Sequence, residues 1–174
     1  MGGIHLLDTE TGEYNKSYIE KYIPSGNAAA VKGVGRVQGL MVKKGNPLGI
    51  KEFADIKNAR YVNRQRGAGT RILCDYLLDK NGISPGEING YNNEEFTHTA
   101  VAALIAAGNA DAGLGIYSAA KMYDLDFIPV CNETYEFLID KEYLDNSMVK
   151  AFFEVLYSDE FKARLDEMGG YTEG

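Results

Sequence analysis

Short apolar segments alternate with longer amphipathic segments along most of this 174-residue chain. The apolar segments have the length and residue types of buried strands, and they lie at residues 39–43, 60–63, 110–116, 125–130 and 134–139. Apolar residues at helical spacing predict helices at residues 51–56, 70–80, 97–107 and 147–168, the last with a break at Ser158. This alternation predicts an α/β fold with mainly parallel sheets, in which ligands bind beyond the carboxyl ends of the strands.

Composition narrows the classes of function. The chain has 18 Lys and Arg against 25 Asp and Glu, a net charge of −7, and 45% of its residues are hydrophobic. This hydrophobic fraction supports a packed core, and the acidic balance argues against binding of nucleic acid or an anionic membrane by the whole surface. No apolar run reaches the ~18 residues that a membrane helix needs. We therefore expect neither a nucleic-acid nor a membrane partner for this segment.

The N-terminus and the metal-binding residue types give two further expectations. The first residues lack the basic start and apolar stretch of a signal peptide, which predicts a cytoplasmic protein; a periplasmic location follows instead if the chain is an N-terminally truncated fragment. Cys74 and Cys131 lie far apart, which predicts two reduced, packed thiols. The two histidines have no metal-ligand spacing, so no metal site is predicted.

The strongest candidate for a binding site is the segment from Arg64 to Arg71, between a predicted strand and a predicted helix. Four of the six arginines of the chain fall between positions 60 and 71, namely Arg60, Arg64, Arg66 and Arg71. Gly67 and Gly69 flank Ala68 and allow a tight turn, and Thr70 can cap the helix or donate its hydroxyl. Amides, helix dipole and guanidinium groups together predict an anion site. The alternative interpretation is that the arginines pair with surface carboxylates and the glycines form a turn.

Two further segments contribute candidate residues. Thr97 or Thr99 is suited to cap the next helix, and the amides there can face the same ligand. His98 contacts the anion in one interpretation and is a capping or packing residue in the other. Gly115, at the end of a predicted strand, allows either close approach of a ligand or close packing of a helix.

No arrangement of catalytic residues is apparent. The chain lacks a P-loop, and residues 33–39 miss the spacing of a dinucleotide fingerprint and precede a strand. No nucleophile elbow or Cys/His arrangement can be assembled from spacing. We therefore expect a protein that is not an enzyme, with no catalytic residues and no cofactor.

Blocks of residues in a fixed order along nearly the whole chain carry a resemblance. They are His5-Leu6-Leu7-Asp8, Gln38-Gly39-Leu40, Gly45-Asn46-Pro47, Asn63-Arg64-Gln65-Arg66-Gly67, Gly69-Thr70-Arg71, Gly90-Tyr91, Thr97-His98, Ala110-Asp111-Ala112-Gly113-Leu114-Gly115, Leu125-Asp126-Phe127 and Gly169-Gly170-Tyr171. With these blocks the chain resembles the periplasmic-binding-protein-like domain found fused to helix-turn-helix regulators and to molybdopterin-biosynthesis proteins. That domain is related to molybdate- and tungstate-binding transport proteins.

The resemblance implies a type II binding-protein fold with a ligand held at the cleft between two lobes. Lobe two would span residues 37–116, and residues 1–36 and 117–174 would form part of lobe one. It also implies non-catalytic binding of a small oxyanion, with molybdate or tungstate the leading candidates, in sensing, molybdenum-cofactor-related regulation or ABC-type transport. Carried over by position, Arg64–Arg71 would supply anion contacts of lobe two, and the helix start at Thr97 would face the same cleft.

The chain departs from the family pattern at its N-terminus. Family members have a strand–helix–strand unit before the block that begins at His5, so lobe one is expected to be incomplete here. An incomplete sheet has an exposed edge that favours pairing with another chain, which predicts a homodimer. The resemblance further implies an upstream DNA-binding or molybdopterin-biosynthesis domain in a longer protein.

Three alternatives for the function stay open at this point. The first is the effector-binding domain of a transcription regulator, similar to the LysR substrate-binding domain, that recognises a small organic anion. The second is an enzyme of molybdenum-cofactor assembly, and the third is a domain that has lost binding.

Overall fold

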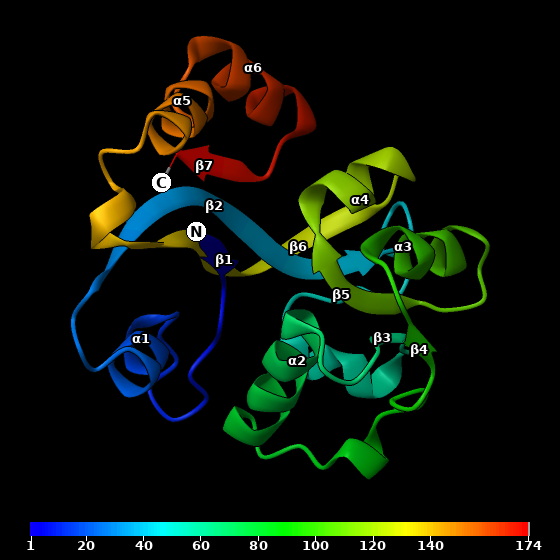
Figure 1. Cartoon of the computed structure of the whole chain (residues 1–174). Helices are drawn as coiled ribbons and strands as arrows, with labels where there is room; N and C mark the ends of the chain where they lie inside the picture. Colours follow the sequence, from blue (N-terminus) through cyan, green and yellow to red (C-terminus); the bar gives the residue numbers. More distant parts are fainter. Residues whose placement is uncertain (174) are drawn as a thin grey trace. The chain divides into compact units, whose positions relative to one another are not determined.

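The structure is a computed structural model that describes residues 1–173, and it divides into two compact units. Unit 1 comprises Met1–Arg36 and Asn132–Gly174, and unit 2 comprises Val37–Cys131. Two long strands, β2 (Ala28–Val42) and β6 (Asp126–Asp140), each contain residues of both units (Figure 1). These two strands are neighbours in a five-stranded sheet of order β1-β6-β2-β5, in which β7 also pairs with β2.

Unit 2 contains the helices and strands around the predicted binding segment. In chain order they are the 3₁₀ helix η1 (Phe53–Asn58), β3 (Asn63–Arg64), α2 (Gly69–Lys80), the 3₁₀ helix η2 (Pro85–Glu87), β4 (Glu94–Glu95), α3 (His98–Ala106), β5 (Ala112–Ile116) and α4 (Tyr117–Met122). Strand β2 pairs antiparallel with β5, so that Gly39 lies opposite Gly115. Strand β3 pairs parallel with β4 in a separate two-stranded sheet.

Unit 1 contains the two chain ends. Its other elements are β1 (Gly2–Ile4), α1 (Lys16–Tyr22), the 3₁₀ helix η3 (Lys141–Tyr143), α5 (Ser147–Leu156), α6 (Asp159–Met168) and β7 (Tyr171–Glu173). Strand β1 pairs antiparallel with β6, and β7 pairs antiparallel with β2. The predicted break between the last two helices is confirmed, because the Ser158 hydroxyl caps α6 by accepting from the Phe161 amide.

The α/β fold class is confirmed, but strand orientation and some boundaries differ from the prediction. The β1–β6, β2–β5 and β2–β7 ladders of the five-stranded sheet are antiparallel, and the parallel ladder is that of β3 and β4. The segments 125–130 and 134–139 form one strand, and the helix expected at 51–56 is 3₁₀. Unit 2 extends to Cys131, beyond the residue 116 expected for lobe two, and Ala119, Ala120 and Leu125 pack in the same core cluster as Met41 and Val101.

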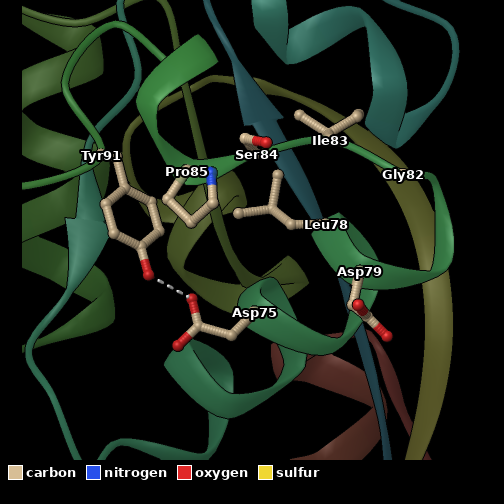
Figure 2. Close-up of a pocket in the computed structure, with 8 residues that line it drawn as sticks. All are labelled: Asp75, Leu78, Asp79, Gly82, Ile83, Ser84, Pro85 and Tyr91. Atoms are coloured by element: carbon tan, nitrogen blue, oxygen red, sulfur yellow. Dashed lines mark hydrogen bonds between the residues drawn. The ribbon is translucent and has the colours of Figure 1, made fainter.

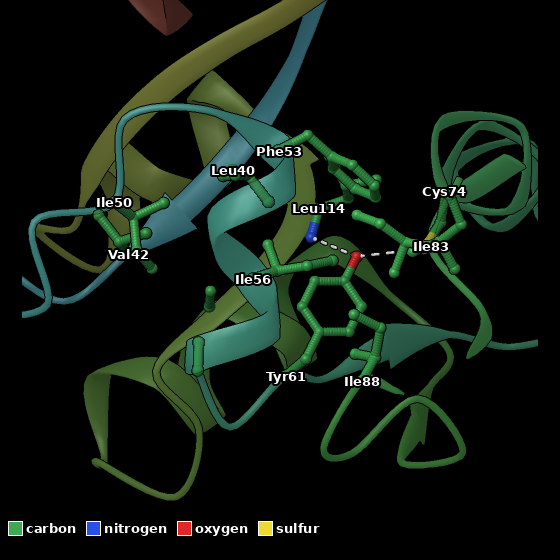
Figure 3. Close-up of a cluster of buried hydrophobic side chains, with 13 residues drawn as sticks. Leu40, Val42, Ile50, Phe53, Ile56, Tyr61, Cys74, Ile83, Ile88 and Leu114 are labelled. Carbon is green, nitrogen blue, oxygen red and sulfur yellow. Dashed lines mark hydrogen bonds between the residues drawn. The ribbon is translucent and has the colours of Figure 1, made fainter. Parts of the chain in front are cut away.

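Two buried clusters form the core of unit 2. The first surrounds Tyr61 and includes Leu40, Ile56, Cys74 and Leu114 (Figure 3). The Tyr61 hydroxyl lies 3.6 Å from the Cys74 sulfur and accepts from the Leu114 amide at 3.3 Å, so the buried phenol is hydrogen-bonded. Burial raises the pKa of the Tyr61 hydroxyl well above its usual value and raises the pKa of the Cys74 thiol to about 11.

The second cluster joins α3 and α4 to the β2–β5 pair and includes Met41, Val101, Ala102, Ile105 and Ala120. Gly113 of β5 is required here, because a Cβ at this position would lie 2.6 Å from the Val101 side chain and 2.8 Å from the Val62 carbonyl. The alanine-rich helix α3 can therefore pack directly on the strand.

Candidate anion-binding site

Helices α2 and α3 follow the parallel strands β3 and β4 at the same end of a two-stranded sheet. In the β3–β4 pair, Asn63 lies opposite Glu94 and Arg64 lies opposite Glu95. Helix α2 begins at Gly69, five residues after β3 ends, and α3 begins at His98, three residues after β4 ends. The Gln65 amide donates to the Glu95 carbonyl at 3.1 Å and continues the strand pairing into the loops. The N-terminal ends of α2 and α3 thus follow neighbouring strand ends, where backbone amides favour an anion.

The first turn of α2 has amides that no side chain caps. Ala68 is the N-cap residue and has no side-chain hydrogen bond of this kind, so of the two roles that the sequence suggests for Thr70, capping and donation of its hydroxyl, capping is not found. The Thr70 hydroxyl instead donates to Gln38 Oε1 at 2.8 Å, and both side chains are buried. Gly67 has a φ of 88°, which favours glycine at the turn before the helix. The contribution of Thr70 to a ligand would therefore come from its amide.

The start of α3 is arranged as the sequence predicts. Thr97 is the N-cap residue, and its hydroxyl oxygen accepts from the Ala100 amide at 3.0 Å. His98 is half-buried and lies beside β5, because a Cβ built on Gly115 would be 3.5 Å from His98 Nδ1. Gly115 itself is buried, and that Cβ would also meet the Met41 side chain, so close packing accounts for this glycine.

Two of the four clustered arginines, Arg60 and Arg64, are hydrogen-bonded to other residues of unit 2. Arg60 forms a two-nitrogen contact with Asp111, at 2.6 and 2.9 Å, which raises the pKa of Arg60 and lowers the pKa of Asp111. Arg64 donates from Nη2 to the Phe96 carbonyl at 2.9 Å and from Nε to the Glu95 carbonyl at 3.2 Å. The Arg64 side chain therefore joins the loop before α2 to the loop before α3.

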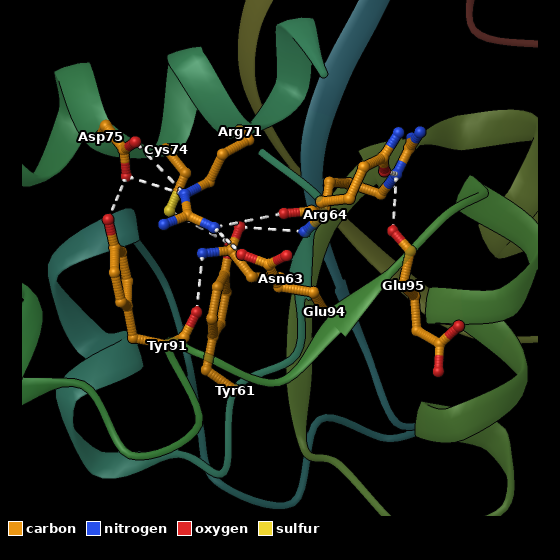
Figure 4. Close-up of polar contacts among 10 residues, drawn as sticks. Tyr61, Asn63, Arg64, Arg71, Cys74, Asp75, Tyr91, Glu94 and Glu95 are labelled. Atoms are coloured by element: carbon orange, nitrogen blue, oxygen red, sulfur yellow. Dashed lines mark hydrogen bonds and ion pairs between the residues drawn. The ribbon is translucent and has the colours of Figure 1, made fainter. Parts of the chain in front are cut away.

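Arg71, which the sequence analysis expects to contact a ligand, is buried and bonded to carboxylates (Figure 4). Its Nε lies 3.1 Å from Asp75 Oδ1, and its Nη1 donates to Glu94 Oε1 at 2.7 Å. The guanidinium carbon lies 4.3 Å from the centre of the Tyr91 ring. Burial opposes the charged form, but hydrogen bonds with Tyr91, Glu94 and Asp75 outweigh it and raise the pKa of Arg71. For Arg60 and Arg71 the alternative interpretation, pairing with carboxylates, is the one the structure supports.

Arg66 differs from its three neighbours. It is exposed, and within residues 1–173 no hydrogen bond or ion pair engages its guanidinium group. The adjacent Gly67 is exposed too, and Ala68 and Gly69 are partly exposed. Of the ten residues predicted for the site, this leaves Arg66, the Gly67–Thr70 amides and the start of α3 as groups placed to meet a ligand.

Several residues of this region were missed by the sequence analysis as site residues, namely Gln38, Asp75, Tyr91 and Glu94. Asp75 had a signal in the sequence, because it lies four residues after Arg71 on one helix. The other three lie more than 15 residues from their partners and are brought there by folding.

A cavity of about 460 Å³ lies along the C-terminal half of α2, away from its first turn (Figure 2). It is lined by Asp75, Leu78, Asp79, Gly82, Ile83, Ser84, Pro85 and Tyr91. The Tyr91 hydroxyl donates to Asp75 Oδ1 at 2.8 Å on one side of the cavity. Two carboxylates make this cavity unsuited to an anion, so the candidate site is the pair of helix N-termini.

The residues that the structure describes contain no group of three or more His, Cys, Asp or Glu side chains placed to hold a metal ion. Both cysteines are free thiols, Cys74 buried and Cys131 half-buried. None of the helices in residues 1–173 has the length and apolar character required to cross a membrane.

Comparisons with known proteins identify the fold family. The PBP superfamily domain matches residues 1–157. The Bacillus subtilis (strain 168) protein YvgK is 38% identical over 170 residues, which cover 97% of this chain and 54% of YvgK. The chain thus spans about half the length of that relative.

Solved structures with this fold include ligand-binding domains. The effector-binding domain of QuiR in complex with shikimate aligns with a TM-score of 0.56 at 18% identity, over 75% of this chain and 64% of that one. L-phospholactate-bound PEB3 aligns with a TM-score of 0.52 at 20% identity, over 83% of this chain and 68% of that one. Since the family match covers most of the chain, this protein belongs to the family of PBP superfamily domains.

Proposed function

We propose that this chain is a non-catalytic domain that binds a small oxyanion at the N-termini of α2 and α3. The single observation that carries this proposal is the state of the clustered arginines. Arg60, Arg64 and Arg71 are engaged by protein groups, and Arg66 is exposed beside the uncapped first turn of α2. A cation and free amides at one helix start are the groups that bind an oxyanion.

Molybdate and tungstate are the first ligands to test, in a sensing, molybdenum-cofactor-related regulatory or transport role. The support for them is the resemblance of the residue blocks to molybdate- and tungstate-binding proteins, together with an anion site built largely from amides. Backbone amides at a helix N-terminus suit a tetrahedral oxyanion, because they donate hydrogen bonds to its negatively charged oxygens. The amides do not become protonated themselves.

A small organic anion is the second candidate, in the role of an effector for a transcription regulator. Two proteins of this fold support it, since QuiR is seen with shikimate and PEB3 with L-phospholactate. A carboxylate or phosphate of such a ligand would meet the same amides and Arg66, and its remaining atoms would need an apolar or hydroxyl-binding wall.

The test is a calorimetric and thermal-unfolding titration with molybdate, tungstate, sulfate, phosphate, shikimate and L-phospholactate. A ligand at 100 times its Kd is expected to stabilise the protein by about 2.7 kcal/mol. Binding of a tetrahedral metal oxyanion alone supports the first candidate, and binding of an organic acid alone supports the second. Absence of binding by all six anions would overturn the proposal.

Arg66→Ala locates the site. We expect it to weaken binding at least tenfold, because it removes the free cation and leaves the backbone unchanged. Arg164→Ala is the matched control, since Arg164 is also exposed but lies on α6 in unit 1; its Kd should stay within twofold of the wild type. Equal losses in the two variants would show a general charge effect and no site at α2.

A further inference from the structure

The Arg71 side chain contacts several segments of unit 2 around the loop between β3 and α2. Its Nη1 donates to Glu94 of β4 and approaches the Arg64 carbonyl of β3 at 3.4 Å, and its Nε contacts Asp75 of α2. Its guanidinium plane also stacks on Tyr91, which precedes β4 (Figure 4). One side chain from the first turn of α2 thus bridges both strands of the β3–β4 pair.

The network around Arg71 is closed. Tyr91 donates to Asp75 Oδ1 at 2.8 Å, and Asp75 also accepts from Arg71, so the stacked ring and the carboxylate are fixed to each other. The Arg71 side chain is 4% exposed, whereas those of Asp75 and Glu94 are 47% and 31% exposed. The cation is therefore buried behind the loop, and its carboxylate partners form the outer side of the network.

The loop between β3 and α2 is bonded to the neighbouring loop only near its start, through the Gln65 amide and the Arg64 side chain. Ala68 donates to the Gln65 carbonyl at 3.2 Å, and Arg71 and Ile72 donate to the Ala68 carbonyl at the helix start. Arg66 and Gly67 are exposed. The orientation of this segment thus depends on its two ends. Arg64 and Gln65 hold the first end, and Arg71 joins that end to α2 through the Arg64 carbonyl.

We propose that Arg71 is a positioning residue, which fixes the Arg64–Thr70 loop against β4 so that Arg66 and the first amides of α2 face one ligand. Lysine cannot replace it, because an ammonium lacks the planar fork that reaches Asp75, Glu94 and a carbonyl together. The ligand part of this inference rests on the proposed function, whereas the ordering of the loop does not.

The first experiment needs no ligand. Hydrogen exchange of the Ala68 and Ile72 amides, which donate to the Gln65 and Ala68 carbonyls, should accelerate at least tenfold in Arg71→Lys, whereas exchange of the Leu114 amide in the core should change less than twofold. Arg60→Lys is the matched control, because Arg60 is an ion-paired arginine of the same unit that contacts Asp111 and the Gly108 carbonyl instead of the loop. Equal acceleration at Ile72 and Leu114 would mean that Arg71 serves general stability, and would overturn the inference.

The second experiment uses the anion that binds the wild type. Arg71→Lys should raise its Kd at least tenfold and Arg60→Lys less than twofold. If Arg71 acts through the loop, adding Arg71→Lys to Arg66→Ala should raise the Kd by far less than it does alone. An additive loss, or an unchanged Kd in Arg71→Lys, would overturn the positioning role. If no anion binds the wild type, the proposed function fails, and the exchange measurement still decides whether Arg71 orders the loop.

Discussion

The two units of the chain are stabilised in different ways. Unit 2 has ten basic and ten acidic residues, whereas unit 1 has eight basic and 15 acidic residues and so carries the whole net charge of −7. Of the 25 buried apolar residues in the described part of the chain, 23 lie in unit 2, and Leu7 and Ile139 are the two in unit 1. Burial of apolar surface is the main source of stability, so unit 2 is expected to be the more stable unit.

Unit 1 relies more on aromatic contacts at half-buried positions. Phe137 of β6 packs edge-to-face against Phe152 of α5, at 5.0 Å between ring centres, and Phe153 stacks on Tyr157 at 5.7 Å. A mainly apolar cavity of about 400 Å³ lies beside these rings, lined in part by Val31, Phe153 and Tyr157. Helices α1, α5 and α6 have no buried residues. Unit 1 thus buries far fewer apolar side chains than unit 2 does.

The largest expected effect comes from one substitution made in each unit. Leu78→Ala in α2 should lower the free energy of unfolding of unit 2 by about 3 kcal/mol, because Leu78 is 2% exposed and its removal leaves a cavity. Leu144→Ala in unit 1 should cost less than about 1 kcal/mol, because Leu144 is 37% exposed. Denaturant unfolding monitored by hydrogen exchange in each unit measures both. Similar costs would contradict the comparison.

An ion pair in the described part of unit 1 involves a buried carboxylate. Arg36 Nη2 lies 2.6 Å from Glu133 Oε2, and the Glu133 side chain is 2% exposed. Arg36→Met should destabilise unit 1 by about 2–3 kcal/mol, because it removes the closest cation from a buried carboxylate. The exposed pair of Lys57 and Glu87 in unit 2 is the control, and Lys57→Met should cost less than about 0.5 kcal/mol. Chemical unfolding distinguishes the two, and Arg36→Met/Glu133→Gln should recover part of the loss.

Alkaline pH should weaken unit 2 through its buried thiol. Burial raises the pKa of Cys74 to about 11 from the 9.0 of a free thiol, so the folded state holds the proton more tightly. This contribution is complete below about pH 9 and is lost as the pH rises to 11, by about 2 kcal/mol. Tyr61 has a raised pKa and adds a loss of the same sign at higher pH. Unfolding free energies at pH 8 to 11 should fall less steeply in Cys74→Ala; an equal slope would exclude the thiol as the cause.

The smallest expected effect concerns the charge of unit 1. Screening by salt should stabilise unit 1 by about 1 kcal/mol between low salt and 0.5 M salt, because its acidic residues repel one another. Unit 2, which has no net charge, should change little.

Light scattering on the same samples tests the predicted homodimer, whose formation should also be favoured by salt if unit 1 is the interface. A monomer at high concentration in both buffers would contradict that prediction.

The sequence predicted those features that depend on neighbouring residues. Helix α2 was expected at residues 70–80 and is found at Gly69–Lys80, because its apolar spacing and the following Asn81-Gly82 are local signals. The N-cap of α3 was expected at Thr97 or Thr99 for the same reason, and it is Thr97. The expected break before Thr134 is absent, because the polar Glu133 is accommodated inside β6 by Arg36, which lies 97 residues away.

The candidate site shows the same limit. A cluster of arginines beside a glycine turn was visible in the sequence, but the role of each arginine was not. Asp75 is one turn from Arg71 and Glu94 is 23 residues away, and only the folded chain shows that both contact it. Arg64 and Arg71 are bonded to residues on and next to β4, and Arg66 is exposed. This difference depends on the pairing of β3 with β4, which lies about 30 residues further along the chain and is not visible in the sequence.

The exposed Arg66-Gly67 pair also gives the chain a specific point of proteolytic attack. A protease specific for arginine cleaves where the backbone can leave the folded surface, and Arg66 lies in a weakly bonded loop whose next residue has a left-handed φ. The arginines at 60, 64 and 71 are bonded to other groups, so within unit 2 the nicking by such a protease should concentrate after Arg66. A bound anion would cover that bond, and the survival of the intact chain would report occupancy without a label.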